Sequence, residues 1–154
     1  MRRAGFTVVE MMVVVMIVGV LALLGFPKMR RALDKANVRS ARAYLGTAVA
    51  TGRAVAVQRG CRAVVHFTSG ASGTVWVTAC SRTNPAPAVD TIGGVEQLAS
   101  RYRVTLTLSV TPDSIQFDPR GLSMGGVTKT VGITGSIASS YDSLLVNTIG
   151  KVMR

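Results

Sequence analysis

The sequence contains few of the residues that serve most often in catalytic and metal sites. Among its 154 residues are one histidine, two cysteines and seven acidic residues. His66, the only histidine, has no cysteine or carboxylate at a spacing that indicates a triad or a ligand set. The five acids after residue 58 are scattered and fall mostly in predicted turns. We therefore expect a protein that is not an enzyme, with no metal, no cofactor and no small-molecule substrate.

Two further shortages narrow the function classes. Aromatic residues make up only 5% of the chain and form no cluster on which nucleic-acid bases could stack. The glycines within residues 121–126 have the spacing of a phosphate-binding loop, but the Lys-Ser/Thr pair that would hold phosphate and metal does not follow them. We expect a flexible hairpin turn there.

Apolar residues, by contrast, are concentrated at one end of the chain. Of the 21 residues from Phe6 to Phe26, only Thr7 and Glu10 are markedly polar. As a helix this run is about 31 Å long, enough to cross a hydrocarbon core of ~30 Å. A signal peptide would have a small-residue cleavage site after its apolar run, and none follows here. The run is therefore expected to remain as a membrane anchor.

Glu10 is the anomaly in that run. A carboxylate inside an apolar span costs roughly 2.5 to 3.5 kcal/mol on insertion scales and normally has a partner. No basic residue lies within one helical turn of it. Two interpretations are open: Glu10 lies near the head-group level and reaches water, or its partner is a positive charge supplied by another molecule.

Positive charge dominates the rest of the composition, with a net charge of +11 and a pI near 11.1. Residues 1–57 carry nine bases and two acids, whereas residues 58–154 carry nine bases and five acids. Most of the excess therefore lies directly after the apolar run. An excess this large implies an anionic partner or surface.

The segment after the anchor has the pattern of an amphipathic helix. Pro27 lacks the N–H that a helix interior needs, so we expect a kink there. From residue 28 to residue 58, apolar residues recur at three- and four-residue spacing with arginines between them. Gly60 suits the C-cap. The apolar stripe is expected to pack on the following domain, and the basic face to meet lipid head groups or acidic neighbours.

Residues 59–154 have the pattern of a β domain. Strands are expected at residues 62–68, 74–80, 102–110, 114–117, 128–134, 144–148 and 151–153. Residues 84–94, with their prolines and Gly93-Gly94, are expected to form a loop. Short turns join antiparallel strands, so the predicted fold class is α+β, a long N-terminal helix packed on a small antiparallel β-sandwich.

The two cysteines fit one hairpin. A two-residue turn at Gly70-Ala71 would register the first two strands so that Cys61 faces Cys80, a geometry that a disulfide can use. Their 18 intervening residues fit neither a redox pair nor a usual zinc spacing. Two unrelated reduced thiols are the alternative. Disulfides persist outside the cytoplasm, so a bridge would favour an exported domain.

The first residues resemble a known family. The stretch Gly5-Phe6-Thr7-Val8-Val9-Glu10, followed by the apolar run to Pro27, resembles the leader and N-terminal helix of type IV pilins and type II secretion pseudopilins. The resemblance implies that a prepilin peptidase cuts after Gly5 and methylates the new amine of Phe6. It also implies that Glu10 pairs with the Phe6 ammonium of a neighbouring subunit in a filament. Ala4 departs from the Lys or Arg that the family often has.

The same resemblance implies an orientation. It places the N-terminus in the cytoplasm and the C-terminal domain in the periplasm of a bacterium, with one pass through the inner membrane. A bare count of positive charges opposes this, because the four bases of residues 28–35 outnumber Arg2 and Arg3. We give the leader motif and the cysteines more weight than this count.

The C-terminal residues indicate which subgroup of this family the chain resembles. Residues 115–121 and 145–154 are similar to the C-terminal half of minor pseudopilins of the GspH/FimT type. In DNA-binding FimT-like members the chain ends in Gly-Arg-x-Arg. Here Lys151 replaces the first arginine and Arg154 stands one residue late. The match to the DNA-binding ending is therefore incomplete.

These features predict four segments and a structural function. The segments are a leader (1–5), a transmembrane and assembly helix (6–27), a stem helix (28–58) and a periplasmic domain (59–154). The expected function is that of a minor pseudopilin of the type II secretion pseudopilus, with other pilins, prepilin peptidase and inner-membrane lipid as partners. The alternative is a FimT-like minor pilin that binds DNA for uptake through Arg120, Lys129, Lys151 and Arg154. A third possibility is an anchored domain that never polymerises.

Overall fold

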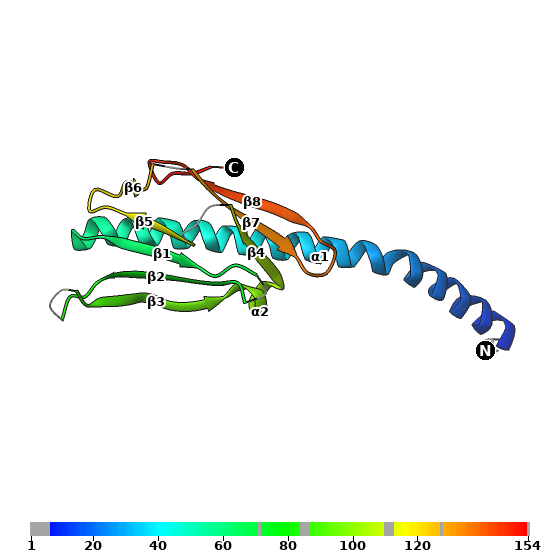
Figure 1. The fold of residues 1–154 in the computed structure, drawn as a ribbon. Helices are drawn as coiled ribbons and strands as arrows, with labels where there is room; N and C mark the ends of the chain where they lie inside the picture. The colour runs from blue at the N-terminus through cyan, green and yellow to red at the C-terminus, as the bar shows by residue number, and fades with distance from the viewer. Residues whose placement is uncertain (1–6, 71, 84–86, 110–112, 127, 154) are drawn as a thin grey trace.

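A computed structural model describes residues 7–70, 72–83, 87–109, 113–126 and 128–153. One long helix and one short helix are combined with nine strands in these ranges (Figure 1). Their bounds are α1 Val8–Arg59, β1 Ala63–Phe67, β2 Thr74–Cys80, β3 Val89–Gln97, α2 Leu98–Tyr102, β4 Val104–Leu108, β5 Ser114–Phe117, β6 Ser123–Met124, β7 Lys129–Gly135, β8 Tyr141–Val146 and β9 Val152–Met153. The predicted α+β fold, a long helix packed on antiparallel sheets, is confirmed.

Helix α1 runs as a single element of 52 residues through the predicted anchor and stem. It begins at a capping box, in which Thr7 and Glu10 satisfy each other's backbone N–H groups, and it ends at Gly60 in the left-handed conformation (φ 62°). Pro27 lies inside the helix and does not end it. Figure 1 shows the N-terminal half bending away from the line of the packed half.

Two antiparallel sheets cover the second half of α1. The five-stranded sheet has the order β3-β2-β1-β5-β6, and the four-stranded sheet has the order β4-β7-β8-β9. The sheets contact each other little, and each packs on α1. The core therefore lies between helix and sheets, around Leu45 and Val49 of α1 and Phe117, Leu106 and Ile133 of the strands. In the predicted sandwich, the two sheets would pack on each other. In the structure, each sheet packs on α1.

The β1–β2 hairpin differs from the predicted register by one position. Ala63 faces Ala79 and Phe67 faces Val75, and the Thr68 N–H donates to the Thr74 carbonyl over 2.9 Å. The connection from Ser69 to Gly73 is therefore longer than the predicted two-residue turn, whose Ala71 lies outside the described residues. The cause is the turn chemistry, because Gly70 (φ 84°) and Gly73 (φ 43°) both adopt positive φ.

Part of the predicted loop at residues 84–94 is wrong. Residues 84–86 lie outside the described ranges, but β3 begins at Val89 and runs through Gly93 and Gly94. Both glycines have positive φ, and the pairing of β3 with β2 shifts nearby, so the strand tolerates them at an irregularity. Tyr102 ends α2, which the sequence did not predict, instead of opening a strand. The predicted glycine-rich turn contains the short strand β6.

Candidate functional site

The N-terminal half of α1 is not buried in the domain. Every residue from Thr7 to Leu33 is exposed, whereas the helix is amphipathic and partly buried from Asp34 onward. One 18-residue window in this helix has a mean hydropathy of 2.7 and none of it is buried, which makes α1 long and apolar enough to cross a membrane. A helix that is apolar all round requires an apolar surrounding, either lipid or other helices.

Glu10 lies near the start of this exposed half. Its carboxylate accepts the Thr7 N–H over 3.4 Å, and its own N–H donates to the Thr7 hydroxyl over 3.2 Å. This arrangement leaves Glu10 exposed and leaves its negative charge without a cation among the described residues. Gly5 and Phe6, the predicted cleavage and methylation positions, lie outside the described ranges. The intermolecular pairing of Glu10 therefore remains a prediction.

Asp34 marks the boundary between the exposed and packed halves, and sequence reasoning missed it. It is fully buried, with its Oδ1 accepting the Ile137 N–H over 3.1 Å and its Oδ2 accepting the Ser140 N–H over 2.9 Å. A Cβ at Gly135 would come within 2.3 Å of Oδ1. Burial alone would raise the pKa of Asp34, but the N–H groups of Ser140 and Ile137 outweigh it and hold the pKa below its ordinary value. The available sequence signal was that Asp34 is the only acid between Glu10 and Asp90.

The far end of the packed half is fixed by a disulfide. Cys61 and Cys80 are bridged, with their Cα atoms 6.3 Å apart, so the predicted bond is confirmed. It forms despite the shifted register because Cys61 precedes β1 and is not held in its ladder. Arg59, the last residue of α1, pairs with Asp90 at 3.0 Å, and the Ser81 hydroxyl and the Arg59 guanidinium hold the pKa of Asp90 below its usual range.

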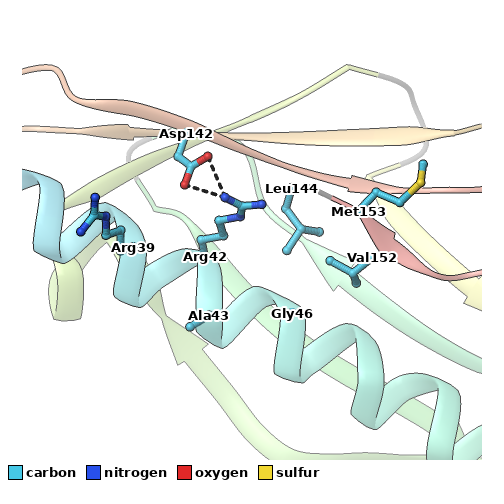
Figure 2. Close-up of a pocket in the computed structure, with 8 residues that line it drawn as sticks. All are labelled: Arg39, Arg42, Ala43, Gly46, Asp142, Leu144, Val152 and Met153. Carbon is cyan, nitrogen blue, oxygen red and sulfur yellow. Dashed lines mark hydrogen bonds and ion pairs between the residues drawn. The ribbon is translucent and has the colours of Figure 1, made fainter.

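An open groove of about 750 Å³ runs between α1 and strands β8 and β9 (Figure 2). Within it, one guanidinium nitrogen of Arg42 reaches both carboxylate oxygens of Asp142, at 3.1 and 3.0 Å. Arg39 lines one end of the groove without a partner among the residues drawn, and Leu144 and Val152 form the apolar side. The groove is polar and open, so it resembles a surface for another chain more than an enclosed ligand site.

Three of the four bases predicted for DNA lie within the described residues, and they differ in exposure. Arg120 and Lys151 are exposed on two turns, and each turn is held by a side chain: Asp118 accepts the Arg120 N–H over 2.9 Å, and Asn147 accepts the Lys151 N–H over 2.7 Å. Lys129, in contrast, is half-buried and donates to the Ser114 carbonyl, and burial lowers its pKa. Arg154 lies outside the described residues.

His66 is placed as a packing residue. Its ring stacks on Trp76 with 4.8 Å between centroids, and its Nε2 lies 2.9 Å from the Thr78 hydroxyl. Burial lowers its pKa, which favours the neutral ring. Across the described ranges, no group of three or more His, Cys, Asp or Glu side chains is arranged to hold a metal ion.

Comparisons with known proteins agree with this geometry. Residues 1–26 match a family model described as the prokaryotic N-terminal methylation motif. No curated protein matches the chain. The solved structures similar to it include the type IV minor pilin FimU of Pseudomonas aeruginosa strain PAO1 in two crystal forms. The form in space group P21 gives a TM-score of 0.57 at 13% identity, over 77% of this chain and 88% of FimU. The form in space group P65 gives a TM-score of 0.53 at 12% identity, over 75% of this chain and 90% of FimU.

At such low identity the likeness defines the fold and no more. The fold is that of a type IV minor pilin, which confirms the predicted pilin-like architecture. The chain therefore combines a pilin-like fold with a match to the N-terminal methylation motif over residues 1–26.

Proposed function

We propose that this chain is a minor pseudopilin, a structural subunit of the periplasmic pseudopilus of a type II secretion system. Prepilin peptidase would cut after Gly5 and methylate Phe6 in the inner membrane. The observation that carries the proposal is the exposed apolar half of α1, Val8 to Leu33, which extends from a domain whose core is already closed. The role proposed is structural and not catalytic.

Assembly would proceed through helix packing. In the membrane the apolar half of α1 is surrounded by lipid, and in a filament neighbouring helices would replace the lipid around the same residues. Glu10 is the one acid on this surface, so it specifies axial register by pairing with the Phe6 ammonium of the next subunit. The disulfide between Cys61 and Cys80 supports a periplasmic domain, because such bonds persist in oxidising compartments.

Two substitutions of Glu10 test this role. Glu10→Ala should leave membrane insertion intact and abolish incorporation into filaments, because it removes the charge and the carboxylate that accepts the Thr7 N–H. Glu10→Gln is the matched control, since a glutamine can still accept the Thr7 N–H in the capping box but carries no charge. We expect Glu10→Gln to fail as completely as Glu10→Ala. Incorporation of Glu10→Gln at the level of the unmodified protein would refute the charge pairing.

A second candidate is a FimT-like minor pilin that takes up DNA. It is favoured by the exposure of Arg120 and Lys151 on two turns that lie near each other. A Cβ at Gly150 would come within 2.6 Å of the ring of Phe117, which ends the strand before the Arg120 turn. Each phosphate contact would make affinity fall steeply with salt. The test is a DNA shift by the full chain in neutral detergent, with Arg120→Gln/Lys151→Gln as the variant. No binding at about 50 mM salt would dispose of this candidate.

A further inference from the structure

A small pocket lies where α1 leaves its apolar run, and it shares no lining residue with the groove between α1, β8 and β9. Its volume is about 350 Å³. It is lined by Phe26, Met29, Arg30 and Leu33 of α1 and by Arg103 and Ile137 of the domain. The pocket thus combines an apolar surface with two guanidinium groups, and its lining contains no carboxylate.

The domain side of this pocket is rigidly attached to the helix. Arg103 adopts a left-handed conformation (φ 52°), and its carbonyl accepts both the N–H and the hydroxyl of Ser136, over 2.9 and 2.8 Å. The next residue, Ile137, donates its N–H to Asp34. Asp34 stands one helical turn beyond Arg30 on α1, so these bonds hold Arg103 and Arg30 at the same level.

The two guanidinium groups have no acid to neutralise them. Arg30 lies over the ring of Phe26, with 4.9 Å from its guanidinium carbon to the ring centroid, an interaction that keeps its charge. Arg103 is exposed, and neither arginine forms an ion pair within the described part of the chain. Two fixed like charges beside one apolar pocket favour an anion that carries an apolar part.

The depth of the pocket indicates which anion this is. Arg30 follows Phe26, the end of the apolar run, by four residues, which is ~6 Å along a helix. In the anchored subunit both arginines therefore lie in the head-group layer, where phosphate groups of anionic lipids are concentrated. We propose that the pocket binds one anionic phospholipid, with its phosphate between Arg30 and Arg103 and its apolar part against Phe26 and Met29. This inference rests on the proposed function, because it requires the anchor.

Lipid retention by the full chain tests the site. The protein is reconstituted in nanodiscs of equal parts phosphatidylcholine and phosphatidylglycerol, released into mild detergent, and its bound lipids are counted by native mass spectrometry. We expect one phosphatidylglycerol retained at least about tenfold over phosphatidylcholine, and a loss of that preference in Arg30→Gln/Arg103→Gln. Lys28→Gln/Arg31→Gln removes the same number of positive charges from the same stretch of α1 but outside the pocket, and should change retention by less than about twofold.

The outcomes separate the lipid site from the anchor. Equal losses in Lys28→Gln/Arg31→Gln and in Arg30→Gln/Arg103→Gln would reduce the effect to general surface attraction and overturn the site. Undiminished retention in Arg30→Gln/Arg103→Gln, with its disulfide and thermal unfolding unchanged, would overturn it too. Resistance to alkaline carbonate extraction tests the anchor separately, and extraction of the unmodified chain from membranes would overturn the proposed function together with the site.

Discussion

The two halves of α1 are parts of one continuous helix, but they meet different surroundings. From Val8 to Leu33 the side chains are exposed and mostly apolar, and none of them is buried against the domain. From Asp34 to Arg59 the helix alternates buried apolar residues, such as Leu45, with exposed polar ones. The packed half buries its apolar side chains within the chain. The exposed half can bury its apolar side chains only in lipid or against other molecules.

The comparison also shows where the energy of the fold resides. The domain needs the packed half as its central core element, because both sheets bury their inner faces against it. The exposed half contributes no buried surface to the domain. A variant in the exposed half should therefore affect assembly and leave stability unchanged, and a variant in the packed half should do the reverse.

A pair of leucines tests this division with the largest expected effect. Leu45 is 0% exposed and Leu24 is 65% exposed. Leu45→Ala should lower the free energy of unfolding by roughly 2–5 kcal/mol through lost burial and a cavity, whereas Leu24→Ala should change it by less than about 0.5 kcal/mol. Urea unfolding of the full chain in detergent, followed by the fluorescence of Trp76, measures both. Similar losses in the free energy of unfolding at the two positions would show that the two halves of α1 do not differ in this way.

The disulfide between Cys61 and Cys80 lies at the far end of the packed half of α1. Replacing Cys61 and Cys80 by serine should cost about 3 kcal/mol, because the bond closes a loop of about 20 residues in the unfolded chain. Reduction of the unmodified protein is the matched control and should cost the same amount. The same urea experiment checks this, and a double variant as stable as the oxidised protein would contradict it.

Asp34 lies at the boundary between the exposed and packed halves of α1, so its substitution tests where the two halves divide. Because the folded-state pKa of Asp34 is lowered, its contribution to stability is fully present above its unfolded pKa of ~3.9 and is lost as the pH falls through the folded value. Asp34→Asn should therefore cost about 1–3 kcal/mol at pH 7 and progressively less in acid. Unfolding free energies from pH 7 to pH 2 measure this. A cost that stays constant over that range would show that the charge plays no part.

The ion pair between Arg42 and Asp142 should have the smallest effect. Both side chains are partly exposed, at 21% and 31%, so solvent screens the pair. A double-mutant cycle with Arg42→Gln and Asp142→Asn should give a coupling of about 1 kcal/mol or less. A coupling several times larger would mean that the groove is closed to water in solution.

Features with local causes were predictable from the sequence. The helical pattern from residue 28, the Gly60 cap and the alternation of residues 104–108 each depend on neighbours in the chain. The long apolar helix at the N-terminus was also evident, since a long apolar run needs no tertiary information.

Features that depend on distant residues were missed or displaced. Asp34 can be buried only because a turn about a hundred positions later donates two N–H groups to its carboxylate. Strand β3 contains Gly93 and Gly94, which indicate a loop in isolation, but the residues on either side of them pair with β2 and carry the strand through this irregularity. Lys129 resembles a free surface base in the sequence, and only the fold turns it toward Ser114.

The mass of the N-terminal peptide, from protein recovered from its native membrane, tests the central claim most directly. That claim is that the exposed half of α1 is a processed assembly helix. The account predicts a mature chain that begins at Phe6 and carries one methyl group on its amine. A mature chain that begins at Met1, or an unmethylated Phe6, would contradict it.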